Sequence, residues 1–292
     1  MNKIKIIIDS AATLPSKMIE QNNISVVPLK VIWPEENING NVKSSDLFES
    51  MRATLSDTGP KTSQPSVGDF KKAFEEAFNA YDEIICITLS TGISGTYNSA
   101  MQAIKFLPKE KQDKIAVIDS FTVDSGEGFV ALKALEFAQK GLELIEIVSH
   151  LEKFKTGVKV AGFPGDPKWI ERNGRLSKTG ANLIRQMEKI GIRPLLTLKD
   201  GKVAVTSLKF KAKDKAESLL NELKGKIKDK NAVAAITHAD MLDVAEELKQ
   251  KLANECPNIE VLFIDEINPI IGCHIGPDSI ICCYYLKEND VI

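Results

Sequence analysis

The sequence has few arginines, no long hydrophobic run and little net charge. Only five of its 38 basic residues are arginine, and the 292 residues carry a formal net charge of -2. So small a charge creates no extended field that would attract nucleic acid or an anionic membrane. An anionic ligand must therefore be held by a local site, and the shortage of arginine argues against bidentate recognition of phosphate.

Membrane-spanning and disulfide-rich classes are also disfavoured. No apolar segment approaches the ~20 residues that a spanning helix needs, because Asp9 ends the N-terminal run Ile6–Ile8. The five cysteines form no C-x-x-C pair, and several lie in apolar segments typical of buried strands. We therefore expect reduced, buried thiols in a cytoplasmic protein rather than a redox or zinc site.

Short aliphatic runs alternate with amphipathic helical segments along most of the chain. In the helical segments apolar residues recur three and four positions apart, as at Phe70, Phe74 and Ala77. Five runs are predicted to be buried strands, at residues 3–8, 83–89, 114–118, 232–237 and 260–264. This alternation indicates an α/β fold with largely parallel sheets.

The second half departs from that rhythm. Two β-forming runs, 192–198 and 202–208, are separated by Lys199, Asp200 and Gly201, which predicts an antiparallel β-hairpin. The segment 157–177 is rich in glycine and proline, and we expect it to be an irregular connection. We place a domain boundary near residue 155. The expected organisation is two α/β domains, residues 1–155 with a mostly parallel sheet and residues 156–292 with a mixed sheet.

The segment 89–100 combines glycines with hydroxyl side chains at the end of a predicted strand. Ser94 and Thr96 stand at the start of the next helix, where unpaired N–H groups and the helix dipole favour an anion. Gly92 and Gly95 would let a ligand approach the backbone closely. A simple serine N-cap explains the same residues equally well.

A second polar segment, Lys61–Ser66, is expected to be a loop that precedes another predicted helix. Ser66 is expected to cap that helix, with Asp69 completing a capping box. Capping does not use Thr62, Ser63 or Gln64, whose hydroxyl and amide groups could donate to a carboxylate or phosphate. A solvated turn is the alternative.

His274 is one of only three histidines and lies in an apolar C-terminal stretch. A single histidine in such a stretch is more often a core residue than a functional one. Gly272 on one side and Gly276 and Pro277 on the other suggest a shaped turn, from which the ring could donate to an anionic head group. His238 has no companion cluster of ligands, so no metal site is expected.

An enzymatic alternative uses the same residues. Ser94 and His274 could serve a small-ester hydrolase or acyltransferase as nucleophile and base. The sequence identifies no acid partner, and Thr96 stands where a nucleophile elbow requires glycine.

Eight short motifs, taken in order, carry a family resemblance. They are Asp9–Pro15, Thr62–Pro65, Ser94–Tyr97, Asp119–Ser120, Gly174–Ser177, Arg193–Leu196, Asp200–Gly201 and Gly272–Pro277. Over residues 6–286 the chain resembles the DegV family of bacterial fatty-acid-binding proteins, which includes the FakB subunits of fatty acid kinase.

The resemblance implies two α/β domains with one long-chain fatty acid bound at their junction. The family's carboxylate-binding threonine and serine correspond to Thr62 and Ser94, and its histidine near the head group corresponds to His274. Ser63 and Gly95 lie beside these residues as expected second contacts. Hydroxyl groups and a helix N-terminus suit a carboxylate, because charge-assisted hydrogen bonds are strong.

The resemblance also implies a non-catalytic carrier that has no metal and no cofactor. Such a carrier presents its fatty acid to a separate ATP-dependent kinase, which releases an acyl phosphate. No nucleic-acid partner is expected, whereas transient membrane contact stays open. Two departures from the family pattern, Ile275 and Asp278, bear on head-group contacts, and Lys211 stands where many members have a kinase-facing arginine.

Overall fold

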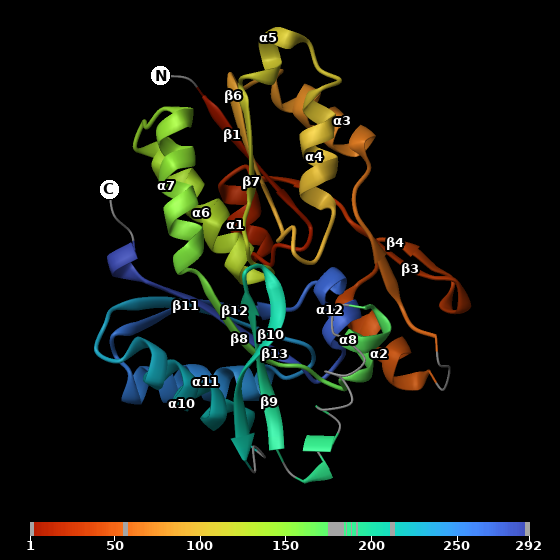
Figure 1. Ribbon diagram of the computed structural model, residues 1–292, viewed down its shortest axis with the longest axis vertical. Coiled ribbons are helices and arrows are strands. Elements are labelled where there is room, and N and C mark those ends of the chain that lie inside the picture. The colour runs from red at the N-terminus through yellow and green to blue at the C-terminus, as the bar shows by residue number, and fades with distance from the viewer. Residues whose placement is uncertain are drawn as a thin grey trace.

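The computed structural model describes residues 3–54, 58–174, 184, 186–187, 189–190, 192–210 and 214–289. In these residues helices flank a four-stranded and a six-stranded sheet, and a three-stranded sheet lies beside them (Figure 1). The α/β class expected from the sequence, with a parallel first sheet and a mixed second sheet, is confirmed. The domain boundary expected near residue 155 falls in the last turn of α7 (Leu144–Gly157) and stays a prediction.

The first sheet is parallel, with strand order β2-β1-β6-β7. Its side chains alternate between two faces. Ile7 packs in the cluster of Phe70, on the side of α3 and α4, whereas Ile8 packs in the cluster of Phe129, on the side of α6 and α7 (Figure 1). The strands are β1 (Ile4–Asp9), β2 (Ser25–Val27), β6 (Glu83–Thr88) and β7 (Ile115–Asp119), and the helices are α1 (Ser16–Gln21), α3 (Val67–Ala77), α4 (Thr96–Ile104), α5 (Lys109–Gln112), α6 (Ser125–Gln139) and α7.

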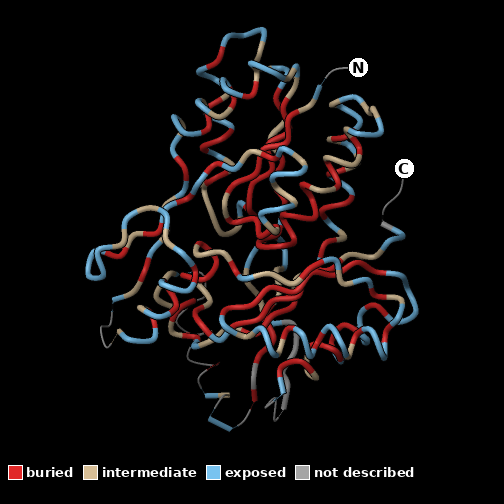
Figure 2. Tube along the Cα trace, turned by 180° about the vertical axis from the view of Figure 1, so that it is seen from behind, coloured by how far each residue is buried: buried red, intermediate tan, exposed pale blue. Residues whose placement is uncertain are grey.

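The second sheet has the order β10-β9-β8-β13-β11-β12, in which β11 and β12 are parallel and the other pairs antiparallel. Helices α10 and α11 cover the face that lies farther from the first sheet (Figure 1). The other face packs in the hydrophobic cluster that contains Phe129 of α6. Buried residues therefore continue from one sheet to the other (Figure 2). The elements are β8 (Lys159–Phe163), β9 (Ile192–Lys199), β10 (Lys202–Phe210), α10 (Lys215–Ile227), β11 (Ala232–His238), α11 (Leu242–Glu255), β12 (Ile259–Glu266) and β13 (Ile280–Leu286), followed by a 3-10 turn, η2 (Lys287–Asn289).

A small antiparallel sheet, β4-β3-β5, lies beside the junction of the two larger sheets (Figure 1). Helix α12 contacts β3, β5, α2 and α8, so these short elements form one packed group. Their bounds are β3 (Lys30–Trp33), a 3-10 turn η1 (Pro34–Glu36), β4 (Ile38–Gly40), α2 (Ser44–Ala53), β5 (Lys61–Ser63), α8 (Lys168–Arg172) and α12 (Pro269–Ile275).

The five predicted strands and the hairpin are confirmed as β1, β6, β7, β11, β12 and the β9–β10 pair. Two local predictions need correction. The segment 157–177 is not irregular over its described residues, 157–174, because β8 and α8 lie within it. Its Gly162 fits a central strand through close packing, since a Cβ atom there would lie 2.9 Å from the carbonyl oxygen of Ile280. The turn expected over residues 272–277 begins only at Gly276, which has φ 79°, because Asn268 and Pro269 begin a helix that continues through Ile275.

Candidate functional site

A narrow apolar pocket lies between the two large sheets. Its empty space, including the mouth, is about 860 Å³, of which the centre of a water molecule can reach about 100 Å³. The walls are mostly aliphatic, and Thr62, Ser94 and His274 are among the few polar side chains. Other lining residues come from β8, β9, β10, β13 and α12, and include Val160, Leu196, Val203, Ile270, Ile271 and Ile281.

Thr62 reaches the pocket from β5, a short strand in place of the expected loop. Thr62 pairs with Val31 of β3. Because side chains alternate along a strand, Thr62 points to the opposite face from Lys61 and Ser63. The Thr62 Oγ1 atom lies 2.9 Å from the Nε2 atom of His274, at hydrogen-bond distance. The structure therefore brings together two of the residues predicted to hold a head group.

His274 lies in the last turn of α12, and both ends of this helix are held. At its start the Asn268 Oδ1 atom accepts a hydrogen bond of 3.0 Å from the backbone N–H of Ile271. Near its end the carbonyl oxygen of Cys273 accepts one of 3.0 Å from the Asn173 side-chain amide. A Cβ atom at Gly272 would lie 2.5 Å from Phe48 of α2, so only glycine permits this approach.

Ser94 lines the pocket just before α4. The N-cap of α4 is Gly95, so the simple serine N-cap is not what the structure shows. The Ser94 hydroxyl lies 2.9 Å from Oγ1 of Thr96 and accepts a longer hydrogen bond, 3.3 Å, from the Thr96 N–H. This loop thus places the Ser94 hydroxyl on the pocket wall, directly before the N–H groups of the first turn of α4.

Ser63 and Gly95 do not belong to the described residues that line the pocket. A Cβ atom at Gly95 would lie 2.3 Å from Oε1 of Gln64, and the Gln64 amide donates to Ser99 Oγ at 2.9 Å. Close packing against Gln64 therefore explains the glycine, and the direct contacts expected of Ser63 and Gly95 stay predictions.

Two aspartates of the shared motifs organise the loops around Ser94. The carboxylate of Asp9 accepts hydrogen bonds from the N–H groups of Ala11, at 2.8 Å, and Leu89, at 2.9 Å. Asp119 accepts from the N–H groups of Thr91, at 3.2 Å, and Phe121, at 3.0 Å. Burial raises the pKa of Asp9 to about 7 although both hydrogen bonds lower it. These side chains tie the loop that carries Ser94 to the ends of β1 and β7.

Four further positions that the family resemblance singles out lie outside the residues that the structure describes. They are Arg175, Leu176, Ser177 and Lys211. Of the two departures from the family pattern, Ile275 lines the pocket, whereas the exposed Asp278 forms a 2.8 Å ion pair with Arg52.

The described residues contain no group of three or more histidine, cysteine, aspartate or glutamate side chains that could hold a metal ion. All five cysteines are free thiols and buried, as expected, and burial raises the pKa of Cys273 and Cys283 far above the ordinary value. In the part of the chain that the structure describes, none of the helices is both long and apolar enough to span a bilayer.

Sequence reasoning missed a buried polar cluster beside the pocket. It contains Thr13, Asp124, Thr237 and Asn268, linked by hydrogen bonds between segments that are distant in sequence. The only local signal was Asn268 before Pro269, a typical helix start.

Comparison with known proteins identifies the family. The sequence profile of the DegV family of uncharacterised proteins matches residues 3–287. This chain belongs to the DegV family. Protein DegV of Bacillus subtilis is 31% identical over 294 residues, which cover 97% of this chain and 99% of the relative. A DegV domain-containing protein of Clostridium acetobutylicum is 30% identical over 290 residues, covering 98% and 99%.

Solved DegV structures share the fold. The structure of Bacillus subtilis DegV, described as a fatty acid binding protein, has a TM-score of 0.82 and 26% identity over 98% of this chain and 100% of that chain. A fatty-acid-binding DegV family protein from Thermus thermophilus has a TM-score of 0.86 and 23% identity over 97% and 99%. At 23% identity, the similarity to the Thermus thermophilus protein shows a shared fold and nothing more.

Proposed function

We propose that this chain binds one long-chain fatty acid, with the carboxylate at Thr62, Ser94 and His274 and the acyl chain in the apolar pocket. The observation that carries the proposal is the polarity of the pocket: Thr62 and His274 form a polar pair on its wall, Ser94 also lines it, and the other walls are mostly aliphatic. Membership of the DegV family supports it, because the related Bacillus subtilis protein is described as binding fatty acids.

The energetics of such a ligand suit this pocket. Each methylene that leaves water contributes about 0.8 kcal/mol, so a long aliphatic chain supplies most of the binding free energy. The carboxylate would otherwise lose its hydration, and hydroxyl or imidazole donors replace that hydration with charge-assisted hydrogen bonds. Thr62 and His274 lie 2.9 Å apart, and when the His274 Nε2–H donates to Thr62 Oγ1, the Thr62 hydroxyl can donate its own proton to a carboxylate oxygen without separating the two side chains. Ser63 and Gly95 would act as outer contacts.

We further propose that the protein is a cytoplasmic carrier and has no catalytic residues of its own. A separate ATP-dependent kinase would phosphorylate the carboxylate of the bound fatty acid, with transient membrane contact to load it. The hydrolase alternative gains no support from the described contacts: Ser94 pairs with Thr96, and His274 pairs with Thr62. Nucleophilic catalysis would require a Ser94–His274 hydrogen bond.

Native mass spectrometry and oleate titration test the binding proposal. We expect purified protein to carry, or to accept, one fatty acid per chain. Thr62→Val should weaken oleate binding by about 10- to 150-fold, because it removes a charge-assisted hydrogen bond of about 1.5 to 3 kcal/mol. Thr156→Val, which removes an exposed hydroxyl from α7, is the matched control and should bind as the wild type does.

Four outcomes would contradict parts of the proposal. A wild-type protein that is ligand-free and also ignores oleate and palmitate excludes fatty-acid binding. Unchanged affinity in Thr62→Val excludes this head-group site. Turnover of an activated ester that disappears in Ser94→Ala would favour the hydrolase, and failure of any fatty acid kinase to phosphorylate the bound lipid would remove only the carrier role.

A further inference from the structure

A buried chain of polar side chains connects the two large sheets just behind the pocket. Its members are Thr13 in the loop after β1, Asp124 at the N-cap of α6, Thr237 near the end of β11 and Asn268 at the N-cap of α12. Thr13 is 4% exposed, Asp124 and Thr237 are fully buried, and Asn268 is half-buried. Polar groups that leave water are costly unless they are paired, so the pairing of these four is informative.

Asn268 uses its whole side-chain amide. Its Oδ1 atom accepts from the N–H of Ile271, while its Nδ2 atom donates to the carbonyl oxygen of Ala11, at 2.9 Å, and to Oγ1 of Thr13, at 2.7 Å. A flipped amide would direct its oxygen at the carbonyl of Ala11, so these partners define the orientation. One side chain thus both caps α12 and joins it to the loop after β1.

The chain continues through Thr13 to Asp124. The Thr13 hydroxyl donates to Oδ1 of Asp124 at 2.5 Å, and the Thr237 hydroxyl donates to Oδ2 at 2.6 Å. Asp124 therefore receives one hydrogen bond from the side of each large sheet. These contacts give rigid support to α12, because every link is short and the two that end on Asp124 are buried.

Asp124 is held in an unfavourable state. Its backbone has φ 59° and ψ -140°, a region that residues other than glycine rarely adopt. Burial also raises the pKa of its carboxyl, although the hydrogen bonds from Thr13 and Thr237 lower it. Such strain persists only where the surrounding structure imposes it, and it is concentrated at functional sites.

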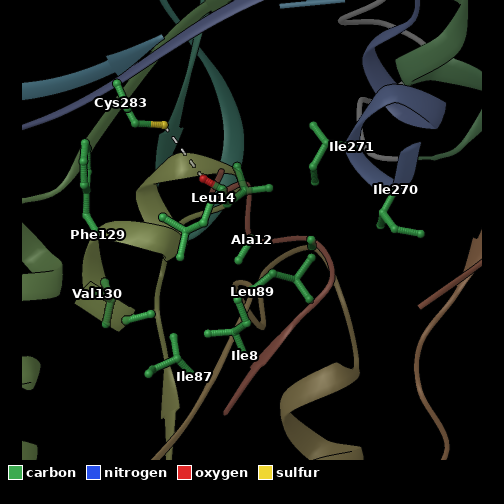
Figure 3. Close-up of a cluster of buried hydrophobic side chains, with 14 of the residues drawn as sticks. Ile8, Ala12, Leu14, Ile87, Leu89, Phe129, Val130, Ile270, Ile271 and Cys283 are labelled. Carbon is green, nitrogen blue, oxygen red and sulfur yellow. Dashed lines mark hydrogen bonds between the residues drawn. The ribbon is translucent and has the colours of Figure 1, made fainter. Parts of the chain in front are cut away.

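Helix α12 is the part of the pocket that this chain of hydrogen bonds supports. Ile270, Ile271, His274 and Ile275 of α12 all line the pocket. Ile270 and Ile271 belong to the same cluster as Ala12, which lies beside Thr13 in the loop after β1 (Figure 3). Displacement of α12 by even part of an ångström would separate His274 from Thr62, since a hydrogen bond weakens steeply with distance and angle.

We propose that Asn268, Thr13 and Asp124 are positioning residues of the head-group site, which set the place of α12 and thereby hold His274 against Thr62. None of the three is among the described residues that line the pocket, so they act through α12 and not on the ligand. The identity of the ligand rests on the proposed function above, whereas the link from Thr13 to His274 does not.

Thr13→Val and Thr13→Ser provide the test. Valine keeps the shape of threonine but breaks the link between Asn268 and Asp124, and serine restores the hydroxyl. We expect Thr13→Val to weaken oleate binding about tenfold, as loss of one aligned head-group hydrogen bond would, and Thr13→Ser to bind within about twofold of the wild type. In the ligand-free protein, Thr13→Val should shift the imidazole NMR signals of His274 toward the positions that they have in Thr62→Val. Thr13→Ser should leave these signals where the wild type has them.

Thr88→Val is the matched control. Thr88 is fully buried in β6, and its hydroxyl donates a long hydrogen bond of 3.5 Å to the carbonyl of Ile118. This variant should lose stability yet keep the oleate affinity and the His274 signals. Equal losses of affinity in Thr13→Val and Thr88→Val would overturn the proposal, as would unchanged His274 signals in Thr13→Val.

A second variant covers the case in which Thr13→Val does not fold. Asn268→Ser keeps a capping oxygen for Ile271 but cannot span both Ala11 and Thr13. The same loss of affinity and the same movement of the His274 signals are expected. If the wild type binds no oleate, the proposed function fails, but the ligand-free NMR comparison still decides the positioning role.

Discussion

The fully buried carboxyl of Asp9 should make the protein more stable at acid pH than at neutral pH, whereas most carboxyl groups have the opposite effect. Burial raises its pKa from 3.8 to about 7 in the folded protein. A carboxyl that binds its proton more tightly when folded stabilises the fold at acid pH, and this stabilisation is lost as the pH rises from the unfolded to the folded pKa. We therefore expect the Asp9 contribution to decline between about pH 4 and pH 7 and to stay level above that range.

The size of the effect follows from the shift. At 1.36 kcal/mol per pKa unit, a rise from 3.8 to about 7 corresponds to at most about 4 kcal/mol. Two other buried carboxyls, Asp124 and Glu127, act in the same direction because burial also raises their pKa. His238 acts in the opposite direction, since burial lowers its pKa and its contribution rises with pH up to about 6.5.

Asp9→Asn isolates the Asp9 contribution, because the amide has nearly the same shape and cannot ionise. Asparagine can accept only one of the two N–H hydrogen bonds from Ala11 and Leu89, so the variant should be less stable than the wild type by about 1 to 3 kcal/mol at pH 4 to 5. The deficit should shrink, and can reverse, by pH 8. Taking the difference between the two proteins removes the contributions that they share, including that of His238.

The assay is urea unfolding at fixed ionic strength between pH 4 and pH 8.5, with the free energy of unfolding obtained at each pH. Asp113→Asn, at an exposed carboxyl, is the control and should follow the wild-type curve. Parallel curves for the wild type and Asp9→Asn would refute the reasoning, since they would show that Asp9 titrates alike in the folded and unfolded states.

Two further substitutions test the fold around the site. Gly201→Ala should destabilise the protein by about 1 to 3 kcal/mol, because Gly201 has φ 72° and a Cβ atom there would lie 2.3 Å from Ser90 Oγ. The same Ser90 hydroxyl donates a hydrogen bond of 2.8 Å to the Gly201 carbonyl oxygen. A melting temperature equal to that of the wild type would contradict this prediction. Arg52→Ala should lower the free energy of unfolding by less than about 1 kcal/mol, and this loss should shrink with added salt. Arg52 forms ion pairs with Asp240 and Asp278 on the surface, where 41% of its side chain is exposed. A large loss of stability that is insensitive to salt would show that solvent does not screen these ion pairs.

Sequence patterns predicted the structure correctly where a helix cap or a turn depends only on residues that are neighbours in the chain. The capping box of Ser66 and Asp69 forms as predicted, with the Ser66 hydroxyl accepting from the Asp69 N–H at 3.1 Å. The Asp200–Gly201 turn closes the β9–β10 hairpin, whose register runs from Lys202 opposite Lys199. Both depend on residues that are neighbours in sequence, so pattern and propensity suffice.

Patterns failed where a neighbour distant in sequence decides the outcome. The glycines of β8 and α12 suggested irregular chain, but Gly162 approaches β13 and Gly272 approaches Phe48. Thr62 was expected in a loop, and only its pairing with β3 makes it part of a strand. In each case the residue type is explained by a contact that the sequence does not record.

The sequence alone determined the α/β class and the main strands, because hydrophobic period and turn chemistry are local properties, and the family motifs pointed to Thr62, Ser94 and His274, which line the pocket. The tertiary structure decided that Thr62 and His274, 212 positions apart, lie within hydrogen-bond distance. It also decided that Thr13, Asp124, Thr237 and Asn268 form one buried chain. Such polar groups are satisfied only when four separate segments fold together, and no periodicity along the chain encodes which distant partners will meet.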